Sequence, residues 1–121
     1  MSADPDELDR LVPAWLPLPD VAERLNTDVG KVRRMLQERI LIAVRRGERN
    51  ILSVPEPLVA GGEPLPNLQG TLTVLADSGY QGEDAVRWLF TPDDTLPGTP
   101  VDHLRAGGKT EVRRRAQALA F

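Results

Sequence analysis

Residues 18–54, LPDVAERLNTDVGKVRRMLQERILIAVRRGERNILSV, are the stretch that decides the fold of this chain. Their pattern predicts two short helices joined by a tight turn, followed by two short strands. The first helix begins near Pro19, which suits a first turn because that position has no N–H partner to lose. Val21, Ala22 and Leu25 then fall on one face of the helix. The small Ala22 lets a second helix cross close to the first.

The turn and the second helix are predicted from the next residues. Asn26 tolerates the left-handed conformation that ends a helix, and Asp28 is placed to cap the helix that follows. We expect this second helix over residues 29–39, because its apolar residues recur at spacings of three and four. These inward positions are Val29, Val32, Met35 and Leu36.

The outward face of this second helix is polar and basic. It carries Gly30, Lys31, Arg33, Arg34 and Gln37. Gly30 costs about 1 kcal/mol of helix propensity relative to alanine, and a residue without a side chain would let the backbone approach a phosphate closely. The alternative interpretation is the ordinary solvated face of a surface helix. The segment that follows favours the binding interpretation.

Two runs rich in β-branched residues predict a hairpin over residues 42–54. A short RGER turn at residues 46–49 separates them and contains the glycine that such a turn favours. Arg45, Arg46 and Arg49 crowd the tip of the hairpin. A basic helix face followed by a basic hairpin suits two contacts on one duplex, with the helix in the major groove and the hairpin on the backbone or minor groove.

Through the runs DVAERLN, DVGKVRRML and LIAVRRGERNIL, the sequence resembles the winged helix-turn-helix of the MerR and excisionase type. The resemblance implies a DNA-binding module with a recognition helix at residues 29–39 and a basic wing at residues 42–54. The expected fold is mainly α with a small β-hairpin, a winged helix-turn-helix followed by a C-terminal helical module. The candidate DNA-binding residues are Lys31, Arg33, Arg34, Gln37, Arg45, Arg46 and Arg49.

The charge of the chain is distributed unevenly. Its 121 residues carry a formal net charge of −3, which by itself argues against a nucleic-acid binder. Residues 20–54, however, hold eight Lys and Arg against five Asp and Glu, whereas residues 55–121 hold six against nine. A phosphate backbone senses charge within a Debye length of about 8 Å. The positive excess therefore lies where the motif lies.

Composition argues against several other classes of function. The chain has no cysteine and one histidine, so disulfides are excluded and a zinc site is not expected. His103 stands alone and no serine lies in a nucleophile setting, so we expect neither an enzyme nor a cofactor. Asp93 and Asp94 lie in a Pro-bounded loop, where exposed acids are common. No apolar run approaches the roughly eighteen residues of a membrane span, and a cytoplasmic protein is expected.

We expect three parts along the chain: an acidic tail at residues 1–17, the winged module at residues 18–56, and a helical module at residues 57–121 packed on it. In the tail, Trp15 is expected to dock on the core as a packing anchor. In the last part, apolar stripes separated by Gly and Pro predict four short helices. The run RRR at residues 113–115 cannot form one patch, because successive helical residues are turned by about 100°. A solvated face is favoured there over a second phosphate contact or a partner surface.

The C-terminal half carries a second resemblance. The run WLFTPDDTLPGTPVDHLRAGGKTEVRRRAQALA is similar to the partner-binding module of some bacterial antitoxins. Nearly the whole chain, most specifically YQGEDAVRWLFTPDDTL and VRRRAQALAF, resembles a family of small actinobacterial DNA-binding regulators that includes a mycobacterial substrate of a membrane Ser/Thr protein kinase. That relative has a longer tail with a phosphoacceptor threonine, whereas here only Ser2 precedes the fold and the first threonine is Thr27. Control by phosphorylation is therefore not carried over.

These patterns lead to one functional prediction and one alternative. We expect a transcriptional regulator that binds double-stranded DNA. The alternative is an adaptor in which the C-terminal module binds a protein partner and DNA binding is secondary. A single module buries only about 600–1,000 Å² on DNA, so we expect two copies on one site. The C-terminal helices are the expected homodimer contact, since they hold most of the large apolar residues outside the motif.

Overall fold

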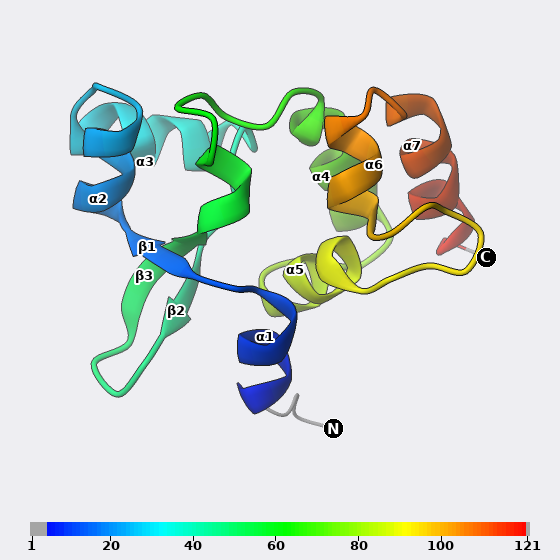
Figure 1. Ribbon diagram of the computed structural model, residues 1–121, viewed down its shortest axis with the longest axis horizontal. Helices are drawn as coiled ribbons and strands as arrows, with labels where there is room; N and C mark the ends of the chain where they lie inside the picture. The colour runs from blue at the N-terminus through cyan, green and yellow to red at the C-terminus, as the bar shows by residue number, and fades with distance from the viewer. Residues whose placement is uncertain (1–4, 121) are drawn as a thin grey trace. The chain divides into compact units, whose positions relative to one another are not determined.

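The computed structural model describes residues 5–120 of the chain (Figure 1). Within this range the protein is mainly helical and contains one small three-stranded antiparallel sheet, as the sequence predicts in outline. The chain divides into two compact units, Met1–Leu65 and Pro66–Phe121. No helix in the described range has both the length and the apolar character needed to cross a membrane.

The helix-turn-helix of the first unit forms as the local sequence signals predict. It consists of α2 (Leu18–Arg24) and α3 (Val29–Gln37), which pack against each other. Asn26 lies in the turn with a φ of 57°, the left-handed conformation that asparagine tolerates. The Asp28 carboxylate accepts a hydrogen bond of 2.8 Å from the Lys31 N–H and so caps α3. The helix ends at Gln37, two residues before the predicted boundary, because Arg39 has a φ of +60°.

The wing is larger than the two-stranded hairpin that the sequence predicts. Strands β2 (Val44–Arg46) and β3 (Ile51–Pro55) pair as expected, with Arg45 opposite Leu52. A third strand, β1 (Trp15–Pro17), pairs along the other edge of β3 and gives the order β1-β3-β2 (Figure 1). A strand of three residues shows too few alternations to be recognised from sequence, and its pairing depends on a partner far along the chain.

The segment predicted to be an acidic tail is therefore part of the first unit. Besides β1, it contains the helix α1 (Pro5–Leu11). Leu8 on this helix is completely buried, and Val12 just after it is only 2% exposed. The expectation that Trp15 docks on folded structure is confirmed by its strand pairing and by its partly buried side chain.

The first unit also extends further than predicted at its C-terminal end. After β3 the chain forms a short 3-10 helix, η1 (Glu56–Val59), which contacts β3. Leu58 and Val59 on it are completely buried, and the Leu65 N–H donates a hydrogen bond of 2.8 Å to the Leu58 carbonyl. The boundary between the units consequently follows Leu65, whereas the sequence predicts it after residue 56.

The second unit contains the four helices that the sequence predicts. They are α4 (Leu68–Asp77), α5 (Glu83–Phe90), α6 (Pro100–Arg105) and α7 (Lys109–Ala118). Helix α4 packs on α7 and α5, and α6 packs on α5 and α7. Thr99 and Asp102 form a capping box at the start of α6. Phe121 lies outside the described residues.

The large apolar residues of the second unit are used inside the fold. The buried ones are Leu68, Leu72, Leu75, Leu89, Phe90, Leu96 and Leu104. In the described part of the chain, the one large apolar side chain counted as exposed is Ile51, which belongs to the wing in the first unit. Most of the residues on which the expected homodimer contact rested are thus used in the core, whereas Trp88 and Leu119 are half-buried.

Candidate nucleic-acid interface

Helix α3 presents one polar, basic face to solvent. Because each helical residue is turned by about 100°, Arg34 and Gln37 lie at the centre of this face, with Lys31 and Arg33 at its two edges. All four side chains are exposed. The opposite side of the helix is fixed in the core by Val32, which has no exposed surface. Four of the predicted contact residues are therefore held outward by a well-anchored helix.

Gly30 lies on the same outward face, in the first turn of α3. A β-carbon placed there would lie 3.1 Å from the Oδ1 atom of Asp28, closer than an ordinary van der Waals contact. That oxygen is the one that accepts the capping hydrogen bond from the Lys31 N–H. The structure thus gives Gly30 a local role, because a side chain at this position would crowd the cap.

The wing adds two more exposed arginines. Its turn requires left-handed backbone at both ends, with a φ of 78° at Gly47 and of 51° at Asn50, and the Asn50 N–H donates to the Gly47 carbonyl at 3.1 Å. Arg45 is exposed on β2, and its Nη1 atom donates a hydrogen bond of 3.0 Å to the Asn50 carbonyl. Arg49 is exposed within the turn itself. The Arg45 guanidinium is therefore oriented along the hairpin.

A shallow groove of about 250 Å³ brings α3 and the wing together. Arg33 enters it from the helix and Arg45 from the strand. The groove is lined by Pro17, Leu18, Pro19, Val29, Arg33, Arg45, Ile51 and Leu52. Two guanidinium groups beside apolar side chains suit a sugar-phosphate backbone, whose phosphate accepts charged hydrogen bonds while its sugar packs on apolar atoms.

Arg46 is placed apart from the other six predicted contact residues. Only 12% of its side chain is exposed, although it is adjacent to Arg45 in the sequence. Its guanidinium carbon lies 5.0 Å from the centre of the Trp15 ring, and its Nη2 atom forms an ion pair with Asp9 of α1. The sequence held the signal for this placement, because successive residues of a strand point to opposite faces.

The remaining basic residues of the interface are not neutralised by acidic neighbours. Across the described residues, none of the five forms an ion pair with a carboxylate. This set, called the basic surface below, consists of Lys31, Arg33, Arg34, Arg45 and Arg49. By contrast, Arg24 pairs with Glu56 at 2.7 Å, and Arg46 pairs with Asp9. The local positive excess predicted for residues 20–54 is therefore concentrated in the basic surface.

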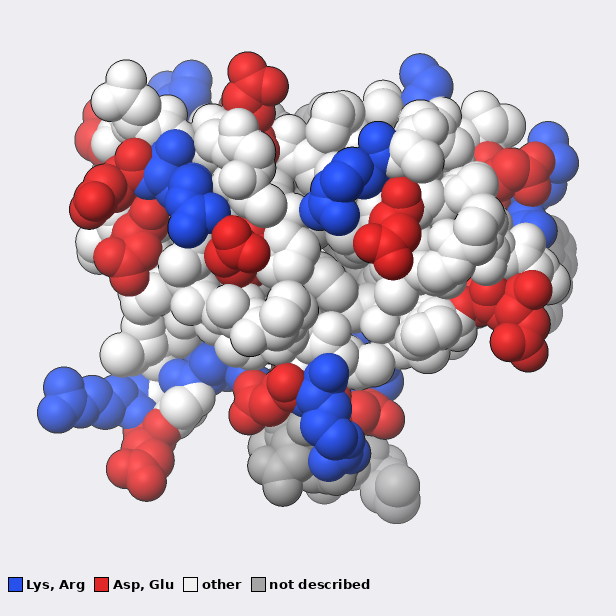
Figure 2. Space-filling model, viewed as in Figure 1, with Lys and Arg blue, Asp and Glu red and all other residues white. Residues whose placement is uncertain are grey.

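Elsewhere the charges alternate in sign. On the side of the molecule shown in Figure 2, Lys and Arg side chains are interspersed with Asp and Glu, and no large area of one sign appears. A basic side chain projects where Figure 1 shows the end of the β2–β3 hairpin. Mixed charge over most of the visible surface fits the acidic net charge of the chain, and it limits attraction of phosphate to a local region.

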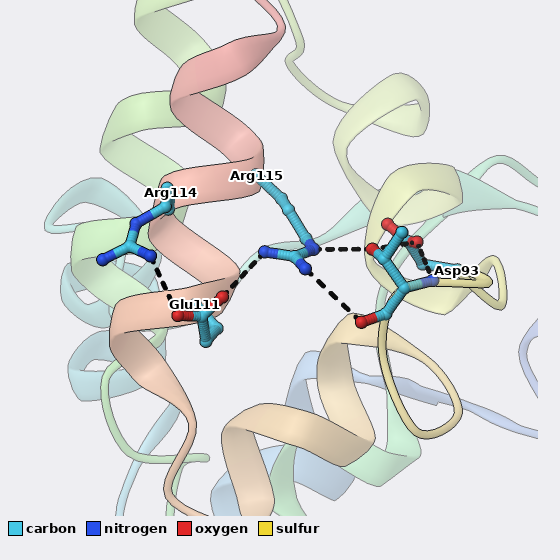
Figure 3. A network of polar contacts seen from close by, with 5 residues as sticks. Asp93, Glu111, Arg114 and Arg115 are labelled. Atoms are coloured by element: carbon cyan, nitrogen blue, oxygen red, sulfur yellow. Dashed lines mark hydrogen bonds and ion pairs between the residues drawn. The ribbon is translucent and has the colours of Figure 1, made fainter.

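In the second unit, one arginine holds a loop to the last helix (Figure 3). Arg115 on α7 donates from Nε to the Thr95 hydroxyl at 2.7 Å and pairs through Nη1 with Glu111 at 2.8 Å. Thr95 in turn donates from its N–H and its hydroxyl to Oδ1 of Asp93, at 2.8 and 2.6 Å. These hydrogen bonds from Thr95, with a smaller contribution from the charge of Arg115, lower the pKa of Asp93 below its ordinary value of 3.8.

The other two residues of the RRR run point elsewhere, as helix geometry predicts. Arg114 pairs with Glu111 at 3.1 Å, and the guanidinium of Arg113 lies against the backbone of Gly70 on α4. The imidazole of His103 similarly lies against Gly108. No group of three or more metal-ligating side chains occurs among the residues that the structure describes. The three arginines of the RRR run and His103 thus have identifiable structural contacts.

Comparison with known proteins places both units in one family. Residues 2–59 match the family described as "DNA-binding protein Rv2175c, wHTH domain", and residues 65–120 match "Rv2175c C-terminal domain of unknown function". The "DNA-binding protein Rv2175c" of Mycobacterium tuberculosis strain ATCC 25618 / H37Rv is 40% identical over an alignment 131 positions long, which covers 98% of this chain and 84% of that protein.

A solved structure agrees with this assignment. The NMR structure of Rv2175c superposes with a TM-score of 0.77 at 38% sequence identity, covering 100% of this chain and 86% of that one. The predicted family of small actinobacterial winged helix-turn-helix proteins is thereby confirmed, while the closer likeness to the MerR type stays a prediction. The chain belongs to the Rv2175c family of winged helix-turn-helix DNA-binding proteins.

Proposed function

We propose that this protein binds double-stranded DNA through α3 and the wing, and that it regulates transcription by doing so. The observation that carries the proposal is the groove in which Arg33 from the helix and Arg45 from the strand meet without a carboxylate partner. Two cations from separate elements on one concave surface form a phosphate-binding arrangement. The name of the mycobacterial relative, which describes a DNA-binding protein, supports the same function.

The dimensions of α3 suit the major groove. An α-helix with its side chains is about 10–12 Å across, and the major groove of B-DNA is about 12 Å wide. With α3 in that groove, the central side chains of its outer face reach base edges. Arg34 donates a pair of hydrogen bonds to a guanine, and Gln37 has the chemistry to pair with an adenine.

The residues at the edges of the interface contact the sugar-phosphate backbone of the DNA. Lys31 and Arg33 flank the outer face of α3, and Arg45 and Arg49 lie on the wing, so these four contact phosphates or a narrow minor groove. Phosphate contacts supply affinity that depends on salt and not on sequence, whereas the contacts of Arg34 supply preference. The proposal therefore assigns affinity and specificity to different side chains.

Selection from a pool of random duplexes tests this function. The protein should enrich a shared short motif. Fluorescence anisotropy should then show at least about tenfold tighter binding to that duplex than to a shuffled one, because each mismatched base pair costs about 1–3 kcal/mol. Failure to enrich any motif, together with equal affinity for both duplexes, would contradict a sequence-reading function. Regulation is then tested by placing the motif across a promoter and measuring RNA synthesis in vitro. If the protein regulates transcription, adding it should change the yield of RNA.

The number of chains on DNA is a separate prediction. One module covers few base pairs, so we propose that two copies bind neighbouring half-sites. Sedimentation of protein with the enriched duplex measures this directly, and a single chain at saturation would contradict it.

A further inference from the structure

The pairing of the strands places Arg46 on the inner face of the wing. Val44 on β2 lies opposite Ser53 on β3, and Ser53 lies opposite Pro17 on β1. Alternate residues of a strand share a face, so Arg46, two residues after Val44, shares this face with Trp15, two residues before Pro17. Arg45 necessarily points to the other face.

The contacts of Arg46 on that inner face come from the start of the chain. Its guanidinium lies over the indole of Trp15 at 5.0 Å, within the range of a cation–π interaction. It also forms an ion pair with Asp9 of α1, a residue 37 positions earlier in the sequence. The Arg46 side chain is 88% removed from solvent, whereas that of Asp9 is 59% exposed. The contact with Trp15 is therefore shielded from water and salt more than the ion pair with Asp9 is.

We infer that Arg46 is a positioning residue that anchors the wing to α1 and β1, and that it does not contact DNA. The inference rests on the proposed function and assigns one of the predicted contact residues a different role. Trp15 and Asp9 then belong to the DNA-binding machinery although neither touches the duplex. The amino-terminal helix controls affinity because it fixes where the wing lies.

The geometry of the hairpin explains why an anchor is needed. Strand β2 is only three residues long and pairs on one side, with β3. Short edge strands open easily because few hydrogen bonds hold them. Arg46 is the last residue of β2, directly before the turn that carries Arg49, and it is covalently next to Arg45. Fixing its side chain on Trp15 and Asp9 therefore orders both arginines of the wing that face DNA.

A charge exchange tests this role. Arg46→Asp places two carboxylates together and should weaken DNA binding at least about tenfold at 0.1 M salt, because the two wing contacts are lost with the anchor. Adding Asp9→Arg restores the ion pair with its charges exchanged and should return affinity to within about threefold of the wild type, since the two sites are directly coupled. If the double variant binds as weakly as Arg46→Asp alone, Arg46 contacts DNA itself and the inference is overturned.

A matched double variant shows whether Asp9→Arg restores affinity by repositioning the wing or only by adding positive charge to the protein. Arg45→Asp with Asp9→Arg has the same net charge as the exchange at Arg46, but Arg45 has no ion pair with Asp9 to restore. It should bind no better than Arg45→Asp alone, and more weakly if anything, because Asp9→Arg also takes the carboxylate away from Arg46. Recovery of both double variants to the same extent would show that the added arginine at position 9 acts only through its charge, against the inference.

A milder substitution keeps the test valid if Arg46→Asp does not fold. Arg46→Met retains an unbranched side chain over Trp15 and removes the charge. It should weaken binding, because the wing is no longer held in place. The slope of log K against log salt should stay unchanged, because Arg45 and Arg49 still reach phosphates once the complex has formed, whereas Arg45→Met should reduce the slope by about 0.9, the value for one phosphate contact. A slope reduced equally by both variants would assign Arg46 to a phosphate and contradict the anchor.

An error in the inference about Arg46 can be distinguished from an error in the proposed function. If the wild-type protein does not bind DNA, the proposed function is wrong, and hydrogen exchange of the β2 amides still reports on the anchor. Those amides should exchange faster in Arg46→Asp and return towards the wild-type rate when Asp9→Arg is added. Unchanged exchange in Arg46→Asp would show that Arg46 does not hold the wing.

Discussion

The arginines of the basic surface, which lies in the first unit, differ from those of the second unit in what surrounds them. In the first unit Arg33, Arg34 and Arg49 are exposed and form no ion pair within the described residues. In the second unit the arginine side chains lie beside carboxylates of their own helices or against a neighbouring one. Those pairs are Arg87 with Asp84, Arg105 with Asp102, and Arg114 and Arg115 with Glu111.

This difference matters more than the number of arginines in each unit. A cation paired with a carboxylate presents little net field to a phosphate and has to lose its partner before binding. The unpaired side chains of the basic surface bear no such cost. Counting charge by segment points to the region that holds the basic surface, and ion pairing then separates its unpaired cations from those that support the fold.

The largest expected effect comes from the groove between α3 and the wing. Replacing Arg33 and Arg45 together by glutamine should weaken binding about 30- to 100-fold at 0.1 M salt, because two phosphate contacts are lost. The matched control replaces Arg113 and Arg114 by glutamine, which removes the same charge from the second unit. We expect that control to bind within about twofold of the wild type, and anisotropy titrations compare the two. An equal loss of DNA affinity in both double variants would contradict the proposed difference between the units.

Substitution of Arg34 separates specificity from affinity within the first unit. Arg34→Ala should cost about 1–3 kcal/mol on an enriched duplex and much less on random DNA, because it removes a paired contact to a base edge. The melting temperature should barely change, since the side chain is exposed and not part of the core. If enriched and random duplexes are weakened alike, α3 is not the recognition helix.

A substitution at Arg115 should show the opposite behaviour. Arg115→Ala removes the hydrogen bond to Thr95 and the pair with Glu111, and we expect about 1 kcal/mol lower stability of the second unit. DNA affinity should stay within about twofold. Urea unfolding followed by the indole NMR signal of Trp88 measures the loss. Arg114→Ala is the control, because it removes only an exposed pair, and a similar loss there would mean that the Thr95 contact is not special.

The smallest effect concerns the acid sensitivity of the second unit. Because folding lowers the pKa of Asp93 below 3.8, its ionised form stabilises the folded state above that pH, and this contribution is lost as the pH falls through the lowered value. Asp93→Asn should therefore reduce stability at neutral pH and converge with the wild type in strong acid. Melting curves between pH 7 and pH 2.5 test this. Parallel curves over the whole range would mean that the charge of Asp93 makes no contribution.

The sequence was informative where structure depends on near neighbours. The stripes of α2 and α3, the left-handed Asn26 and the cap by Asp28 all involve residues within one or two helical turns, and each was predicted. The winged fold and its family followed from those features. The outer face of α3 was predictable for the same reason, because helical periodicity fixes which residues point outward.

The features that were not predicted depend on contacts between distant segments. Strand β1 is defined by Leu16 lying opposite Val54. In the second unit, the hydrogen bond from Arg115 to Thr95 joins residues that are 20 positions apart. Arg46 is a different case, because alternation along β2 was enough to separate it from Arg45. The prediction grouped the wing arginines because they are close in sequence. It overlooked that alternate residues of a strand point to opposite faces, so that Arg45 and Arg46 cannot both face DNA.

The salt dependence of DNA binding tests the central claim most directly. If Lys31, Arg33, Arg45 and Arg49 each neutralise one phosphate, the slope of log K against log salt should be about −3.6, from 0.9 per contact. Replacing these four residues by glutamine should bring the slope close to zero, with α3 and the second unit still folded. A slope that remains near its wild-type value in that variant would show that other cations bind the DNA, and it would contradict the division between the two units.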